Sequence, residues 1–382
     1  MSTRFDAVYM HIGHGKTGSS FLQSTLALSQ DALARHEYAY PLAEDVAQKA
    51  RKGFITGGNL RAKPGEFTTL VQSVPEGAGG KLLISAESLF RYLERNADSF
   101  LEEYQQVCAG VPLRILCYLR DPVDHAISAY HQKVKRSGYT KTMGDSLDQY
   151  QLPARTIAVL SALRAGGADV TVLNYSRHSK DLLESLAGWL DLPSGDLTTP
   201  NVGRVNRSLT NAELELQRLM NGHLGGQASR FVSDPLCNEL PDIRSETPPL
   251  SRDALIGFLT RMRHEIATPE YQALVPETER PQVGEVADHI GRFPADSGQL
   301  TFTPEQLRVF VDSVSRVLLA RESSDPEQPQ RGGKGAGNRG GAGRGQGKGQ
   351  GQGRGRGKGL GKGQGRGQGK GQGRRRQAVD PG

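Results

Sequence analysis

The stretch HIGHGKTGSS, residues 11–20, gathers small, hydroxyl-bearing and basic residues between an apolar run and a helical pattern. A glycine-rich turn at such a place leaves backbone N–H groups free to bind an anion, and the dipole of the following helix adds partial positive charge. Lys16 supplies a full positive charge. The residues that permit a tight path or carry a hydroxyl donor are Gly13, Gly15, Gly18, Thr17, Ser19 and Ser20. These residue types predict a phosphate-binding loop.

Two features argue that the bound phosphate is not that of ATP. The P-loop pattern Gly-x-x-x-x-Gly-Lys-[Ser/Thr] requires a glycine where this sequence has Met10. The apolar run LRILCYL, which should form a buried strand, ends in Arg120, where an ATP site would offer an acid for Mg²⁺. Asp121 follows, but it suits the start of a helix better.

Arg120 belongs to a second pattern. In YLRDPVDHAISAY this arginine ends a strand, and Ser128 lies eight residues later, inside the next helix. A guanidinium can bind two oxygens of a terminal phosphate at once. The pair therefore predicts a second phosphate contact.

Together, HIGHGKTGSSFLQ and YLRDPVDHAISAY resemble the sulfotransferase family that uses 3′-phosphoadenosine 5′-phosphosulfate (PAPS), particularly its bacterial, carbohydrate-sulfotransferase-like members. The resemblance covers roughly residues 5–222. It implies that the loop from Gly15 to Ser20 binds the 5′-phosphosulfate and that Lys16 also acts in catalysis. It implies that Arg120 and Ser128 bind the 3′-phosphate.

Two weaker similarities extend the match. TVLNYSRHSKDLLESLAGWLDLP is similar to a family strand ending in Tyr-Glu-Asp, which implies that Tyr175 lies near the adenine, although Ser176 and Arg177 replace the acids. RVNRSLTNAELELQRLMN is similar to a late segment of bacterial members, in which Arg204 or Arg207 would cover the nucleotide; an ordinary helix start explains it equally well. The family implies no required metal and a hydroxyl or amine acceptor, here a carbohydrate.

A hydroxyl acceptor needs a general base, and three residues are candidates. Glu87 follows the predicted strand KLLISA, so it should lie at the carboxyl end of the sheet, where open α/β folds bind ligands. Glu37, 21 residues after Lys16, and His14, within the loop, are its rivals. We favour Glu87, although it could equally begin a helix.

Apolar runs alternate with helical patterns through the first 200 residues. This order predicts an α/β fold with a P-loop-like, mostly parallel sheet and helices on both faces. The expected strands are FDAVYMHI, KLLISAE, PLRILCYL and ADVTVLNY, and helices are expected over 19–36, 121–138 and 179–192.

Beyond residue 200 the pattern is helical. Thr210 and Glu213 predict a capping box, and further helices are expected near 251–268 and 303–321. The Pro-, Gly- and Ser-rich segment 224–250 predicts a long loop. We expect one sulfotransferase domain over 1–322, followed by a disordered tail over 323–382 that is rich in Gly, Arg, Lys and Gln.

Charge separates the tail from the rest of the chain. Residues 331–382 contain 14 Lys and Arg and one acid, whereas the remaining residues contain 34 basic and 40 acidic side chains. The tail therefore predicts nonspecific binding to a polyanion or nucleic acid. The three cysteines, Cys108, Cys117 and Cys237, match no disulfide framework or zinc pattern, and we expect a cytoplasmic protein without a membrane span.

Two alternatives to sulfuryl transfer stay open on the sequence. The first is an ATP-dependent small-molecule kinase of related P-loop fold, which would prefer ATP with Mg²⁺. The second is a nucleic-acid-binding protein that acts through its RGG-like tail.

Overall fold

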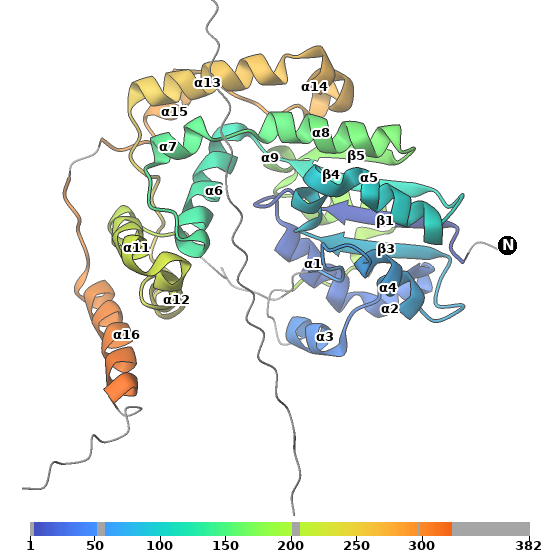
Figure 1. Ribbon diagram of the computed structural model, residues 1–382, viewed down its shortest axis with the longest axis horizontal. Helices are drawn as coiled ribbons and strands as arrows, with labels where there is room; N and C mark the ends of the chain where they lie inside the picture. The colour runs from blue at the N-terminus through green and yellow to red at the C-terminus, as the bar shows by residue number, and fades with distance from the viewer. Residues whose placement is uncertain (1–3, 52–57, 201–206, 296–297, 323–382) are drawn as a thin grey trace, which may run out of the picture. The chain divides into compact units, whose positions relative to one another are not determined.

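The computed structural model describes residues 4–51, 58–200, 207–295 and 298–322, all within one unit, Met1–Asp325. At its centre lies a five-stranded, all-parallel sheet in the order β2-β3-β1-β4-β5. Helices lie on both faces of this sheet (Figure 1). The predicted α/β class is therefore confirmed. The strands are β1 Ala7–Ile12, β2 Tyr38–Ala39, β3 Lys81–Ala86, β4 Leu113–Leu119 and β5 Asp169–Asn174.

The central strands read as continuous apolar runs because both faces of the sheet are buried. In β1, Val8, Met10 and Ile12 belong to one hydrophobic cluster, whereas Ala7 and Tyr9 belong to another. Successive side chains of a strand point to opposite faces, so these two clusters are the two sides of the sheet.

Different helices cover the two sides. The first cluster includes side chains of α4 Glu66–Ser73, α5 Leu89–Val107, α6 Pro122–Ser137, α8 Leu152–Ala165 and α13 Arg252–Ile266. The second includes side chains of α1 Ser19–Leu28, α2 Gln30–Arg35, α3 Glu44–Arg51 and α10 Leu182–Trp189. The sheet is thus enclosed on both faces, and its strand ends are left to build a site.

The helix expected after Arg120 is confirmed as α6, and Gly138 ends it in the left-handed conformation at φ 67°. Asp121 holds the N-cap position of α6 as expected, but its side chain makes no capping bond to the helix. Its Oδ1 instead accepts hydrogen bonds from the Asn174 side chain at 3.1 Å and from the Gln282 backbone N–H at 2.8 Å. Asp121 therefore ties the start of α6 to the end of β5.

The single helix expected over 19–36 is divided into α1 and α2 at Ser29, whose hydroxyl donates to the Thr25 carbonyl at 2.7 Å. The long loop expected over 224–250 is wrong in part, because it contains the 3₁₀ helix η2, Gly225–Arg230, and the helix α12, Ser233–Glu239. Burial of apolar side chains in α12 outweighs the loop-like composition, since tertiary packing overrides weak local propensity.

The capping box of Thr210 and Glu213 is confirmed at the start of α11, Asn211–Leu224. The last expected helix is α16, Pro304–Glu322. The smaller helices are α7 Met143–Asp148, α9 Tyr175–His178, α14 Pro269–Leu274, α15 Val286–Ile290, η1 Ser194–Asp196 and η3 Glu277–Glu279. The expected tail, 323–382, lies outside the described residues. Within the part of the chain that the structure describes, no helix is long and apolar enough to cross a bilayer.

Candidate functional site

A cavity of about 360 Å³ opens at the carboxyl ends of the parallel strands. Three of its lining residues directly follow a strand: Glu87 after β3, Arg120 after β4 and Tyr175 after β5. The loop after β1 contributes Lys16, Gly18, Ser19 and Ser20, and α6 contributes Ser128. The structure thus brings these predicted site residues around one cavity. Gly15 and Thr17 lie in the same loop but do not line it.

The loop between β1 and α1 has an unusual backbone. Gly15, Lys16 and Gly18 all have positive φ angles, of 64°, 59° and 79°. Lys16 is the notable member, because a side chain is rarely found in this left-handed region and such strain is concentrated at functional sites. The Arg120 guanidinium donates a 2.9 Å hydrogen bond to the Lys16 carbonyl, which helps to hold the strained loop.

Two buried hydroxyl groups of the loop have no hydrogen-bond partner within the described residues, Thr17 Oγ1 and Ser19 Oγ. A Cβ added to Gly13 would lie 2.4 Å from Ser19 Oγ, so only glycine permits this close approach. Ser19 begins α1, whose N-terminus carries partial positive charge. An anion placed here would accept from donors that otherwise stay unpaired at a cost.

The loop lysine lies in an electropositive environment. Lys16 Nζ donates to Gln132 Oε1 at 2.9 Å. Burial lowers the pKa of Lys16 below its usual value, and the positive charges of Lys135 and Arg120 lower it further, while the negative charge of Glu87 opposes the shift. A bound anion would therefore favour the charged form of this lysine.

Arg120 also contacts an aromatic ring. Its guanidinium carbon lies 5.3 Å from the centroid of the Tyr175 ring, a distance typical of a cation–π contact. A Cβ added to Gly18 would lie 2.9 Å from the Tyr175 ring, so the loop, the arginine and the tyrosine form one packed wall. The Ser176 hydroxyl accepts the backbone N–H of Asp121 at 3.1 Å. This bond ties the residue after Tyr175 to the start of α6.

Helix α6 supplies four cavity residues that the sequence reasoning missed: His131, Gln132, Lys135 and Arg136. They follow Ser128 at intervals of three, four, seven and eight residues, which is the spacing of one helical face. Once Ser128 was placed in a binding site, this spacing was the signal that could have found them.

Lys135 is the most buried cation of this face, with 5% of its surface exposed. Its ammonium donates to the Arg207 carbonyl at 3.1 Å and to the Cys237 sulfur at 3.4 Å, both of them uncharged partners. A buried charge without a counter-ion is costly. Among the described residues no carboxylate forms an ion pair with Lys135, and an anion in the cavity would supply that negative charge.

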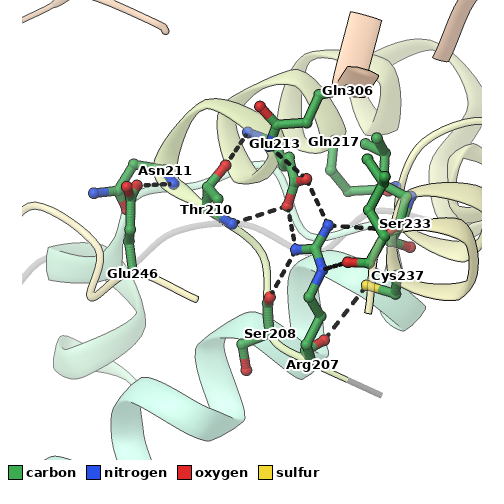
Figure 2. Close-up of polar contacts among 12 residues, drawn as sticks. Arg207, Ser208, Thr210, Asn211, Glu213, Gln217, Ser233, Cys237, Glu246 and Gln306 are labelled. Atoms are coloured by element: carbon green, nitrogen blue, oxygen red, sulfur yellow. Dashed lines mark hydrogen bonds and ion pairs between the residues drawn. The ribbon is translucent and has the colours of Figure 1, made fainter. Parts of the chain in front are cut away.

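Arg207 cannot serve as a phosphate ligand with its guanidinium. All five of its N–H donors are used, and Figure 2 shows the group at the centre of these polar contacts. Two donate to the Glu213 carboxylate at 2.6 and 2.7 Å, and the others donate to the carbonyls of Ser208, Leu236 and Leu240. Arg207 lines the cavity, as expected for a residue that covers the nucleotide, but its guanidinium already pairs with a buried carboxylate. Arg204, its alternative, lies outside the described residues.

The structure separates the three candidate bases. Glu87 lies against the loop, with its Oε1 3.7 Å from the position of a Cβ on Gly15. Glu37 precedes β2, and its carbonyl accepts the N–H of Lys81, the first residue of β3, so it lies at the opposite end of the sheet. His14 is buried against the rings of Phe90 and His125, and burial lowers its pKa to about 4. Of the three, Glu87 alone lines the cavity.

No protein-family model matches this sequence, and no curated protein matches it. The chemistry of the cavity is therefore the basis for a functional proposal. That chemistry is defined by a strained loop with the unpaired hydroxyl of Ser19 and by cations that follow β4 or lie on α6.

Proposed function

We propose that this chain is a PAPS-dependent sulfotransferase that moves a sulfuryl group to a hydroxyl or amine acceptor. The observation that supports this most is that Lys16 with its loop and the Arg120–Ser128 pair line a single cavity. A ligand with two separate anionic groups matches two separate sets of donors. PAPS is such a ligand, since it carries a 5′-phosphosulfate and a 3′-phosphate.

The residues present fit this cosubstrate. The unpartnered hydroxyl of Ser19 and the N-terminus of α1 would hold the phosphosulfate together with the Lys16 ammonium. Arg120 and Ser128 would hold the 3′-phosphate, and the Tyr175 ring lies beside Arg120, where it can pack on the adenine. In this assignment Lys135 adds a further positive charge to the nucleotide side of the cavity.

Sulfuryl transfer needs positioning, charge stabilisation and removal of one proton. The acceptor oxygen forms a bond to sulfur while the bond from sulfur to the bridging phosphate oxygen breaks, and 3′,5′-ADP leaves. Lys16 stabilises the negative charge that develops on the bridging oxygen. Glu87, exposed at the end of β3 beside the loop, accepts the proton of the acceptor hydroxyl.

Nucleotide binding tests the proposal. By calorimetry, we expect 3′,5′-ADP to bind without added metal, and more tightly than ATP with Mg²⁺. Because a charge-assisted hydrogen bond is worth about 1.5–3 kcal/mol, Arg120→Ala should weaken 3′,5′-ADP roughly ten- to a hundred-fold. Arg95→Ala, on the exposed surface of α5, is the matched control and should change nothing. Unchanged affinity in Arg120→Ala, or a preference for ATP with Mg²⁺, would contradict the proposal, and the latter would favour the kinase.

The acceptor follows from the family resemblance and not from any contact in the cavity. We propose a carbohydrate on that ground. A screen of acceptor pools with radiolabelled PAPS identifies it, and transfer only to small phenols or amines would contradict the carbohydrate assignment while leaving sulfuryl transfer intact.

A further inference from the structure

Helix α16, orange in Figure 1, packs on α12 by one face. Val309 is fully buried against α12, and the Ser313 hydroxyl donates to the Phe231 carbonyl at 2.7 Å. The Gln306 side chain donates to the buried Glu213 carboxylate at 2.8 Å, as Figure 2 shows. These contacts fix the rotation of α16 about its axis, and with it the face that α16 presents to solvent.

The exposed side of α16 carries an apolar line of residues beside the exposed Arg308–Asp312 ion pair. Leu307, Val311 and Leu318 are 48%, 55% and 56% exposed, and the half-buried Val314 lies between them. Their spacing of four, three and four residues places them on one narrow line along the helix, here named the α16 stripe. Leu319, at 64% exposed, follows Leu318 and lies about 100° away around the helix axis. Large aliphatic side chains clustered at this exposure indicate a binding surface.

The sequence that follows α16 indicates what this surface binds. Residues 331–382 carry a net charge of +13 and contain no aromatic side chain. An anionic bilayer offers both negative charge and an apolar interior, and stable attachment to it takes two such signals together. A nucleic acid would satisfy the charge but has no surface that covers leucine and valine side chains. A second copy of this chain would contribute only four stripe residues, against roughly 20–30 residues a side in a stable interface.

We propose that the α16 stripe docks on the surface of an anionic membrane and that the positive charge of residues 331–382 holds the chain there. The attachment is peripheral. It keeps the protein on the membrane surface without altering the cavity, and it does not depend on the reaction that the cavity performs.

Co-sedimentation of the full chain with lipid vesicles tests the proposal. Vesicles of phosphatidylcholine with about 30% phosphatidylserine supply the anionic surface, and pure phosphatidylcholine vesicles are the lipid control. Val311→Asn with Leu318→Gln removes apolar surface without changing charge, and both positions are exposed, so the fold should survive. Val311→Ile with Leu318→Met is the matched control that keeps the stripe apolar.

We expect the wild-type chain to bind the anionic vesicles at about 0.15 M salt and to bind pure phosphatidylcholine far less. The polar variant should lose roughly tenfold or more in partitioning, and the apolar control should not. The salt at which each protein elutes from heparin should be equal, because both variants keep the charge. Equal vesicle binding by the polar variant would overturn the proposal. A second result would also overturn it: the wild-type chain does not bind vesicles, forms a dimer in light scattering, and becomes a monomer in the polar variant. The stripe would then bind a second copy of the chain.

Discussion

The buried ion pair of Arg207 and Glu213 should be a main determinant of stability in the C-terminal half of the fold. The side chains of these two residues are 3% and 0% exposed. Burial opposes ionisation of Glu213, but hydrogen bonds from Arg207, the Thr210 N–H and Gln306 outweigh it and lower the pKa of Glu213. Glu213→Gln keeps the shape of the side chain and removes its charge. The Arg207 guanidinium would then be buried without a counter-ion.

Removing one partner of a buried pair typically costs about 3–5 kcal/mol. Because Arg207 would keep its three carbonyl acceptors, we expect a loss near the lower limit, about 3 kcal/mol. Urea unfolding at neutral pH measures it. The matched control is Glu215→Gln in the same helix, where the carboxylate pairs with Arg218 at the surface and the loss should stay below about 1 kcal/mol.

The pH dependence adds a second test of this pair. A carboxylate whose pKa is lowered by folding stabilises the fold above its unfolded value of about 4.3, and this contribution disappears as the pH falls through the folded value. The difference in free energy of unfolding between wild type and Glu213→Gln should therefore become smaller only at acidic pH. Equal losses in Glu213→Gln and Glu215→Gln at neutral pH would refute the assignment of a strong buried pair.

Three further outcomes follow from the structure. Glu87→Gln should reduce turnover on the order of 10²–10⁴-fold with unchanged 3′,5′-ADP affinity, and near-normal turnover would move the base elsewhere. Burial lowers the pKa of His11 to about 4, so the folded chain resists a proton that the unfolded chain accepts below about 6.5. As the pH is lowered from about 6.5 to about 4, the urea concentration at the midpoint of unfolding should decrease, and it should decrease less in His11→Asn. Parallel curves of midpoint against pH for the two proteins would contradict this. Truncation after Glu322 should lower the salt concentration of elution from heparin and leave 3′,5′-ADP affinity unchanged, and an identical elution would show that the tail does not bind the polyanion.

The strand positions were predictable because the central strands are buried on both faces, and a strand buried on both faces consists of consecutive apolar residues. Because parallel strands all end at the same edge of the sheet, the loops that follow them lie at that edge. Lys16, Glu87 and Arg120 follow three such strands, so they could be expected close together. The two-residue strand β2 and the helix α12 were not predictable, since neither has a distinctive local pattern and long-range packing accounts for both.

The choice among equivalent side chains depended on tertiary distances. The sequence places Arg120 after a strand and Arg207 before a helix, but it does not tell which guanidinium is already paired with a carboxylate. Both arginines line the cavity, but Arg207 pairs with a buried carboxylate from α11, whereas Arg120 lies between a strained loop and an aromatic ring.

The candidate bases show the same division. Glu37 and Glu87 each lie beside a strand, but one precedes its strand and the other follows it, and the parallel sheet places them at opposite ends. The sequence by itself determined the α/β class, the glycine-rich loop and the concentration of positive charge in residues 331–382, because each of these is local in the chain. Only the tertiary structure decided which charges are compensated and which face a cavity, since compensation depends on distances between residues that are remote in sequence.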